Sequence, residues 1–239
     1  MDSGTGDPVW RSDSPALRIA VIAALELEAK IPRAVVRNNP PAIYVSGPGR
    51  DRAFQTAQRA IADGATGLIS FGLAGGLSPQ AVTGAVVLPA MLASDAGEWH
   101  ADKAWRNRLA AVLARNFELI DGPLFSAERV LATPNGKAAL AARSGAAAVD
   151  MESAAVAQAA AEAGIPFIAL RVIADGPDDE LPAEVESLVT PDGQTCYRAL
   201  FSFLASPRRL RLLISLAGKS RVARNKLKRV MHHLTRAAR

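Results

Sequence analysis

The sequence has very little cysteine and few aromatic residues, and it has no long run of apolar residues. Its single cysteine, Cys196, excludes a disulfide framework and fits a reducing compartment. No stretch approaches the ~20 consecutive apolar residues that a membrane-spanning helix requires. The N-terminal residues 1–16 lack the apolar centre of a secretory signal, so we expect them to be a disordered segment.

Acidic residues are absent from the C-terminal segment, residues 207–239, which contains eleven of the 28 lysines and arginines. Residues 1–206 therefore hold 17 basic and all 23 acidic residues, so the net charge of +5 hides an acidic body and a basic C-terminal segment. Such asymmetry indicates a body that carries the chemistry and a segment that meets an anionic surface.

The composition and the hydrophobic pattern predict an α/β fold. A chain of 239 residues with 49% hydrophobic content suits one such domain. Apolar runs of strand length alternate with helical patterns, which is typical of a layered α/β/α domain. The expected strands are Leu17–Ala24, Ala42–Ser46, Leu68–Phe71, Val82–Ala93 and the two described next. We divide the chain into a disordered segment (1–16), a catalytic domain (17–206) and a basic helical C-terminal extension (207–239).

The stretch from Ala146 to Asp175 places two carboxylates at the ends of neighbouring strands. A short apolar strand ends in Asp150, a helix opens with Met151 and Glu152, and a second strand runs into Asp175. In open α/β sheets, ligands bind outside the carboxyl ends of the strands. The alternative is structural, with Glu152 as a favourable acid at a helix start and Asp175 as a turn former.

Two glycine-rich turns are further candidates for ligand contact. Gly47-Pro48-Gly49-Arg50 precedes a helix, and free amides at a helix start beside an arginine can hold an anion. Gly72 to Gly76 follows the third strand, and its glycines allow a ligand to approach the backbone closely or simply permit a tight turn.

Four motifs taken together resemble the purine nucleoside phosphorylase and nucleosidase superfamily, which includes 5′-methylthioadenosine/S-adenosylhomocysteine nucleosidase. The motifs are Glu28, Gly72-Leu73-Ala74-Gly75-Gly76, Val149-Asp150-Met151-Glu152 and Arg171-Val172-Ile173-Ala174-Asp175. The resemblance covers about Leu17 to Leu204, and it implies a phosphorylase-like fold around a mixed sheet. The basic, leucine-rich C-terminal extension is similar to that of hopanoid-associated phosphorylases, which act on adenosylhopane.

The resemblance implies a role for each matching residue. Glu152 would accept hydrogen bonds from the ribose hydroxyls, with Met151 packing under the sugar, and Asp175 would protonate N7 of the purine. Glu28 would help to activate a water molecule, and Arg171 would orient the site. The remaining substrate-binding candidates are Asp150, Gly75 and Val130, and the phosphate-binding candidates are Gly47, Gly49, Arg50 and Gly72.

The nucleophile stays open at this stage. Glu28 favours hydrolysis, whereas Thr133-Pro134-Asn135-Gly136 and the turn before Arg50 favour phosphorolysis. In the superfamily, a hydroxyl residue that contacts water or phosphate usually occupies the position of Leu73, and a serine commonly occupies the position of Ala174. We favour phosphorolytic release of adenine from adenosylhopane, with inorganic phosphate as co-substrate and no metal or organic cofactor.

Two alternatives remain beside that interpretation. One is a hydrolytic nucleosidase for methylthioadenosine-like substrates, and the other is a non-catalytic nucleoside-binding or membrane-docking protein. The segment Asp95–Lys103 is short compared with the loop that covers the 5′ side of the substrate in nucleosidases, so we expect that side to be open to a lipid substituent.

The C-terminal segment reads as a short apolar helix that breaks at Gly218, followed by an amphipathic helix. One side of the second helix carries Val222, Leu227, Val230, Met231 and Leu234, and the other side is basic. This pattern is typical of a helix in a membrane interface. A protein partner or self-association is the alternative, and the lack of aromatic residues disfavours nucleic acid.

The expected partners are therefore a small-molecule or lipid-linked adenine nucleoside, an anionic membrane surface that binds residues 207–239, and further copies of the chain in a homo-oligomer. The expected location is the cytoplasm, including the inner face of its membrane. If the segment 207–239 only docks the enzyme, its deletion should leave turnover of a soluble nucleoside nearly intact.

Overall fold

The computed structural model describes residues 18–37, 40–182, 190–194 and 207–236 of the chain. The segment 1–16, expected to be disordered, lies outside the described residues. The helix expected over Gly193–Leu204 also lies almost entirely outside them.

Strands and helices alternate along the chain, as the hydrophobic pattern predicts. The strands are β1 (Ile19–Ala23), β2 (Ala42–Val45), β3 (Gly67–Gly76), β4 (Val86–Val87), β5 (Met91–Ser94), β6 (Gly97–His100), β7 (Leu119–Ile120), β8 (Leu124–Ser126), β9 (Ala148–Asp150) and β10 (Phe167–Asp175). The helices are α1 (Glu26–Val35), α2 (Arg50–Ala62), α3 (Lys103–Leu113), α4 (Pro134–Ser144), α5 (Ser153–Glu162) and α7 (Pro207–Arg236).

The ten strands of the described residues belong to one mixed sheet with β3 and β10 at its centre. The order β6-β5-β8-β9-β3-β10-β4-β7 forms the main path, and β1 lies between β2 and the first half of β3. β3 runs parallel to both β1 and β10, whereas β9 pairs antiparallel with its last two residues. Gly75, near the end of β3, pairs with both Asp175 and Val149. The carboxyl ends of β3 and β10 therefore lie beside β9.

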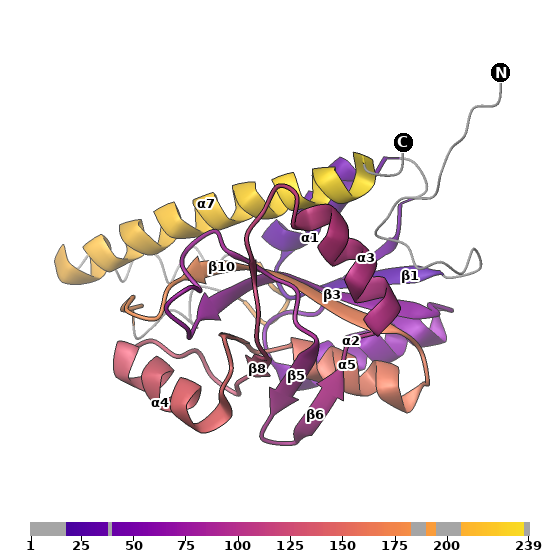
Figure 1. Ribbon diagram of the computed structural model, residues 1–239, viewed down its shortest axis with the longest axis horizontal. Helices are drawn as coiled ribbons and strands as arrows, with labels where there is room; N and C mark the ends of the chain where they lie inside the picture. The colour runs from indigo at the N-terminus through magenta and orange to yellow at the C-terminus, as the bar shows by residue number, and fades with distance from the viewer. Residues whose placement is uncertain (1–17, 38–39, 183–189, 195–206, 237–239) are drawn as a thin grey trace.

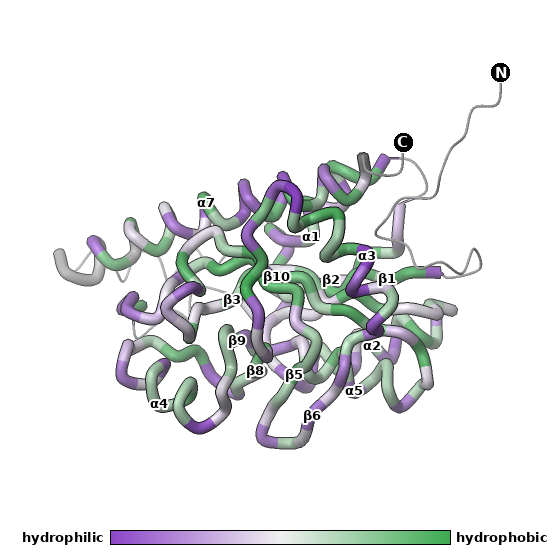
Figure 2. The backbone as a smooth tube through the Cα atoms, viewed as in Figure 1, coloured by the Kyte–Doolittle hydropathy of each residue, from purple (hydrophilic) through white to green (hydrophobic). Residues whose placement is uncertain are grey.

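Helices cover both faces of the sheet, so the expected three-layer α/β/α fold is confirmed (Figure 1). Alternate residues of the central strands point to opposite faces, as in any strand. In β1, Ile19 and Val21 face the core beneath α1, α3 and α7, whereas Ala20 and Ile22 face the core beneath α2 and α5. Apolar residues fill the centre of the molecule between these layers (Figure 2).

The glycine-rich stretch after the third strand differs from the expected turn. β3 continues through Gly76, because Gly72 pairs with Arg171 and Gly75 with both Asp175 and Val149. Two further boundaries shift. The strand expected over Val82–Ala93 is divided into β4 and β5, and the expected turn Thr133–Gly136 is the start of α4, with Thr133 as its N-cap.

The C-terminal segment is one continuous helix, not two helices separated at Gly218. Its second half packs on the sheet between α1 and α3 (Figure 1). The side chains of Leu227, Val230 and Leu234 are at most 1% exposed, while Val222 is 54% exposed. The apolar stripe that we assigned to a membrane interface is thus mostly buried in the core, and the second half of α7 packs as part of the same folded body.

No helix of the described residues is both long enough and apolar enough to cross a membrane. The segment Asp95–Lys103 contains β6, which forms a hairpin with β5. Trp99 of this hairpin packs against the core beneath α2 and α5.

Candidate functional site

A cavity of about 510 Å³ lies at the carboxyl ends of β3, β9 and β10. The described residues around it include four of the carboxylates that the sequence singled out, namely Glu28, Asp150, Glu152 and Asp175. The apolar part of its wall is formed by Leu25, Leu73, Val130, Leu131, Val149, Met151, Leu181 and Leu216. The cavity therefore combines a concentration of acids with an apolar surface large enough to take a nucleoside-sized ligand.

Glu152 occupies the N-cap position of α5, and backbone amides hold its carboxylate. Oε1 accepts a hydrogen bond from the amide of Gly49 at 2.9 Å, and Oε2 accepts one from the amide of Met151 at 3.3 Å. Burial raises the pKa of Glu152 to about 7, and the nearby carboxylate of Asp150 acts in the same direction. An ionised carboxylate in this position can accept hydrogen bonds from two hydroxyl groups of a sugar.

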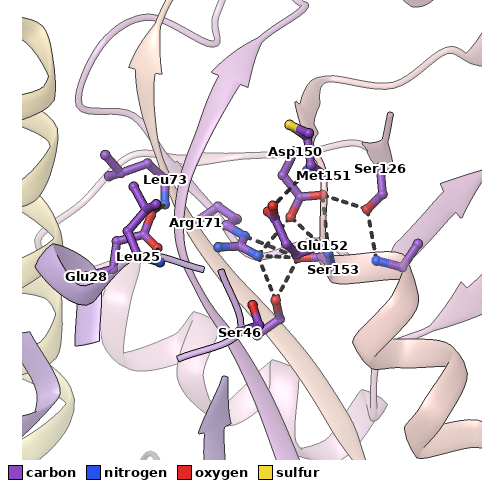
Figure 3. A network of polar contacts seen from close by, with 12 residues as sticks. Leu25, Glu28, Ser46, Leu73, Ser126, Asp150, Met151, Glu152, Ser153 and Arg171 are labelled. Atoms are coloured by element: carbon purple, nitrogen blue, oxygen red, sulfur yellow. Dashed lines mark hydrogen bonds and ion pairs between the residues drawn. The ribbon is translucent and has the colours of Figure 1, made fainter. Parts of the chain in front are cut away.

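Asp150 and Arg171 form a buried ion pair beneath Glu152. Nη2 of Arg171 lies 2.9 Å from Oδ2 of Asp150, and the guanidinium also donates to the hydroxyls of Ser70 and Ser153. Asp150 in turn accepts from Ser126 Oγ at 2.6 Å and from the amide of Ser153. Figure 3 shows this network beside Glu152. Arg171 is only 1% exposed, so it supports the site from below rather than facing the cavity.

Glu28 lies at the start of α1, with its carboxylate held between two backbone amides. Oε2 accepts from Leu25 at 3.0 Å and Oε1 accepts from Leu73 at 2.9 Å (Figure 3). Burial raises the pKa of Glu28, although Arg171 and the two amides partly offset the effect. A carboxylate with a raised pKa that borders a cavity is suited to accept a proton near neutrality.

Asp175 ends β10, and a buried lysine pairs with it. Nζ of Lys137 lies 2.5 Å from Oδ2 of Asp175 and also donates to the carbonyls of Gly176 and Asp179, at 2.7 and 3.1 Å. Burial raises the pKa of Asp175, although Lys137 acts in the opposite direction. Asp175 borders the cavity beside Gly75. A Cβ atom added at Gly75 would lie 3.3 Å from Oδ2 of Asp175.

The four candidates for phosphate binding make contacts within the protein. The amide of Gly49 donates to Glu152, and the guanidinium of Arg50 donates to Gln158 on α5. Gly47 packs against the backbone of Pro191, and Gly72 faces Glu28 and Arg171. The structure thus brings the expected catalytic and sugar-binding residues together, but uses the expected phosphate-binding groups for contacts within the protein.

Lys137, which is 1% exposed, was not among the residues predicted from the sequence. The sequence does contain an indication that Lys137 is buried. It lies three residues before Leu140, on the same side of α4, at a position where an apolar residue is expected. The remaining candidates, Met151, Gly75 and Val130, all line the cavity. The described residues contain no group of three or more histidine, cysteine, aspartate or glutamate side chains arranged to hold a metal ion.

Comparisons with known proteins agree with this geometry. The chain superposes on a 5′-methylthioadenosine/S-adenosylhomocysteine nucleosidase from Neisseria meningitidis, solved with methylthio-immucillin-A, with a TM-score of 0.71 and 19% identity over 92% of this chain and 98% of that chain. It also superposes on futalosine hydrolase from Helicobacter pylori, with a TM-score of 0.66 and 18% identity over 90% and 97% of the two chains. At these identities the likeness shows the shared fold.

A search of curated proteins found no match. A family model described as the phosphorylase superfamily matches residues 28–205, which is most of the chain and includes the cavity residues of α1, β3, β9 and β10. This match supports the expected enzyme activity of nucleoside phosphorylase or nucleosidase type. The chain belongs to the phosphorylase superfamily.

Proposed function

We propose that the protein cleaves the N-glycosidic bond of an adenine nucleoside. The observation that carries this proposal is the meeting of Glu28, Glu152 and Asp175 at one cavity. Glu152 accepts hydrogen bonds from the ribose hydroxyls and opposes the positive charge that develops on the sugar ring as the bond breaks. Asp175 protonates N7 of the purine, and the electron pair of the C1′–N9 bond leaves with the neutral base.

We propose water as the nucleophile. Glu28 occupies the amide of Leu73, and Glu152 occupies the amide of Gly49, so these donors are not free for a phosphate dianion. The carboxylates around the cavity also repel an anion, whereas a water molecule can give its proton to Glu28 as it attacks C1′. Phosphorolysis, which the sequence analysis favoured, has weaker support from these contacts.

The reaction gives free adenine and a ribosyl product, and its test is direct. The purified protein is incubated with an adenine nucleoside, with and without inorganic phosphate, and the products are separated. Hydrolysis predicts free ribose at the same rate in both reactions. Formation of a ribose 1-phosphate that requires phosphate would overturn the choice of nucleophile and restore phosphorolysis. Activity after treatment with a chelator tests the expected independence of metals.

We further propose that the 5′ substituent is large and apolar, as in adenosylhopane. The cavity wall carries Leu216 from α7, and the same helix has Ile214 64% exposed two residues earlier. The lining of the cavity includes no residue from the segment 95–103, which fits an open 5′ side in the described part of the chain. Turnover of a series of adenosines with 5′ alkyl chains of increasing length tests this: kcat/KM should rise with chain length, and a fall would favour a methylthioadenosine-like substrate.

Membrane association is proposed for the first half of α7 only, since its second half is buried. This half contains Arg208, Arg209 and Arg211 in sequence and the exposed Ile214. Basic residues near anionic lipid each contribute about 1 kcal/mol. Sedimentation with phosphatidylglycerol vesicles should be lost in an Ile214→Glu variant and retained in Val222→Glu. Homo-oligomer formation stays a prediction, which sedimentation equilibrium checks.

A further inference from the structure

Lys137 is a positively charged residue whose side chain is almost completely buried. Its side chain is 1% exposed and comes from α4, which otherwise contributes Leu140 to the core beside the cavity. A buried ammonium group is costly unless acceptors surround it. The three acceptors here are Oδ2 of Asp175 and the carbonyls of Gly176 and Asp179, so all three hydrogens of the ammonium group are used.

These contacts leave the two oxygens of Asp175 in different environments. Oδ2 is bound by Lys137, whereas no hydrogen bond to Oδ1 comes from the described residues. Asp175 lines the cavity, so Oδ1 is the oxygen available to a ligand. Lys137 therefore holds one oxygen of the carboxyl group, and the other has no partner among the described residues.

A second ion pair reinforces the first from outside. Lys219 of α7 donates to the carboxylate of Asp179, and the same carboxylate accepts from the amide of Gly176 at 2.7 Å. The turn from Gly176 to Asp179 supplies two of the three acceptors of Lys137. The side chain of Asp179 binds the amide at the start of this turn, and its ion pair with Lys219 connects the turn to α7. Asp175, Lys137, Asp179 and Lys219 form a row of alternating charges from the cavity to the C-terminal helix.

We propose that Lys137 is the positioning residue of the general acid: it holds Oδ2 of Asp175, directs Oδ1 at the purine, and stabilises the carboxylate that remains after the proton has moved to N7. This inference rests on the proposed function. In the step, the O–H bond of Oδ1 breaks and an N7–H bond forms, while the C1′–N9 electron pair leaves with the base. Lys137 keeps its own protons throughout, and water later returns a proton to Asp175.

A charge in this position strengthens the acid. Removal of the cation would raise the pKa of Asp175 further, since burial already raises it and Lys137 opposes that effect. The other charged groups that face Asp175 are Asp179 and Lys219, and those across the cavity are Glu28, Glu128, Arg129, Asp150 and Glu152. Within the described part of the chain, the hydrogen bond to the carboxylate of Asp175 comes from Lys137, which is therefore its direct partner.

The test compares two substrates that differ in how much their leaving group needs a proton. Adenosine requires protonation at N7, whereas p-nitrophenyl β-ribofuranoside releases a phenolate without it. Lys137→Met should reduce kcat for adenosine by about 100-fold, within the range of general acid catalysis, and should reduce kcat for the phenyl riboside less than about threefold. The alkaline limb of the adenosine profile should move to higher pH.

Lys103→Met is the matched control, because it removes the same charge from an exposed residue of α3. It should leave kcat unchanged for both substrates. Equal losses on both substrates by Lys137→Met, or an unmoved alkaline limb, would overturn the proposal. If Lys137→Met does not fold, the pH profile of Lys219→Met tests the same proposal, because Lys219 is the partly exposed last member of the row of charges. Its alkaline limb should move in the same direction by a smaller amount, and no movement would contradict the proposal.

Asp175→Asn separates this inference from the proposed function. Loss of adenosine turnover in Asp175→Asn with full activity in Lys137→Met would reject only the role of Lys137. Full adenosine turnover in Asp175→Asn would reject the general acid itself.

Discussion

Glu28 and Arg171 approach each other across Gly72, which has no side chain to separate them. A carbon atom added at Gly72 would lie 2.3 Å from Nη1 of Arg171 and 2.6 Å from Oε1 of Glu28. Both distances are far below van der Waals contact. Gly72 therefore permits the buried cation to lie beside the proposed base, which gives this glycine a steric role.

Replacement of this glycine should be costly. We expect Gly72→Ala to displace Glu28 or Arg171, to lower the free energy of unfolding by about 2 to 4 kcal/mol and to abolish turnover. Gly218→Ala is the control, because this helical glycine has no neighbouring atom within 4 Å of the added carbon. It should raise the free energy of unfolding by about 0.5 to 1 kcal/mol. Chemical denaturation measures both, and equal stabilities of the two variants would contradict the account.

Glu28→Gln tests the proposed base. The amide keeps one acceptor for the backbone of Leu25 or Leu73 but cannot accept a proton from water. We expect kcat to fall by about 10²- to 10⁴-fold with little change in KM. Because burial raises the pKa of Glu28, the acidic limb of the parent's kcat profile should lie above the ordinary range for glutamate, and it should be absent from the variant's profile. An unchanged profile would remove Glu28 from the mechanism.

Glu152 should make the protein less stable as pH rises. Its pKa is about 7 in the folded state and near 4.3 in the unfolded chain, so between these values the folded state binds more protons. Stability from this group is therefore fully present below about pH 4 and is lost as pH rises through 7. At pH 8, Glu152→Gln should be more stable than the parent by about 1 to 3 kcal/mol, although it should lose sugar binding.

Thermal unfolding of both proteins at pH 5 and pH 8 checks this prediction. The difference between them should be smaller at pH 5, where more of the parent's Glu152 is protonated. A variant that is less stable than the parent at pH 8 would show that the ionised carboxylate contributes net stability.

Helix α7 should be required for folding, contrary to the expectation that the segment 207–239 can be removed without effect on catalysis. Leu227 is fully buried, so Leu227→Ala should cost about 2 to 5 kcal/mol. Ile214→Ala, on the exposed side of the same helix, should change stability by less than about 0.5 kcal/mol. Deletion of residues 207–239 should give insoluble protein, and a soluble, active truncation would contradict the packing of α7.

The sequence predicted the parts of the site that depend on strand ends. Asp150 and Asp175 each end an apolar strand, as predicted. The two strands are not neighbours in the sheet, however, because β3 lies between them and runs antiparallel to β9, so their meeting depends on the pairing of both strands with the end of β3. The sequence could not predict the partner of Asp175, because a lysine in a helix is usually solvated and only the tertiary fold places Lys137 against that strand end.

The helix α7 was misassigned for a different physical reason. An apolar stripe with a basic opposite side fits a membrane interface and a protein core equally well, and only the sheet beneath Leu227 and Val230 decides between them. The sequence likewise could not show that Gly49 donates its amide to Glu152, since 103 residues separate them.

The most direct test of the account is the release of free adenine. The parent protein, Asp175→Asn and Glu152→Gln are each incubated with adenosine and with a 5′-alkylated adenosine, and adenine is quantified by chromatography. The account predicts adenine from the parent and a loss of at least about 100-fold in both variants, each folded by circular dichroism. Release of adenine at the parent's rate by either variant, or no adenine from the parent on any adenine nucleoside, would contradict it.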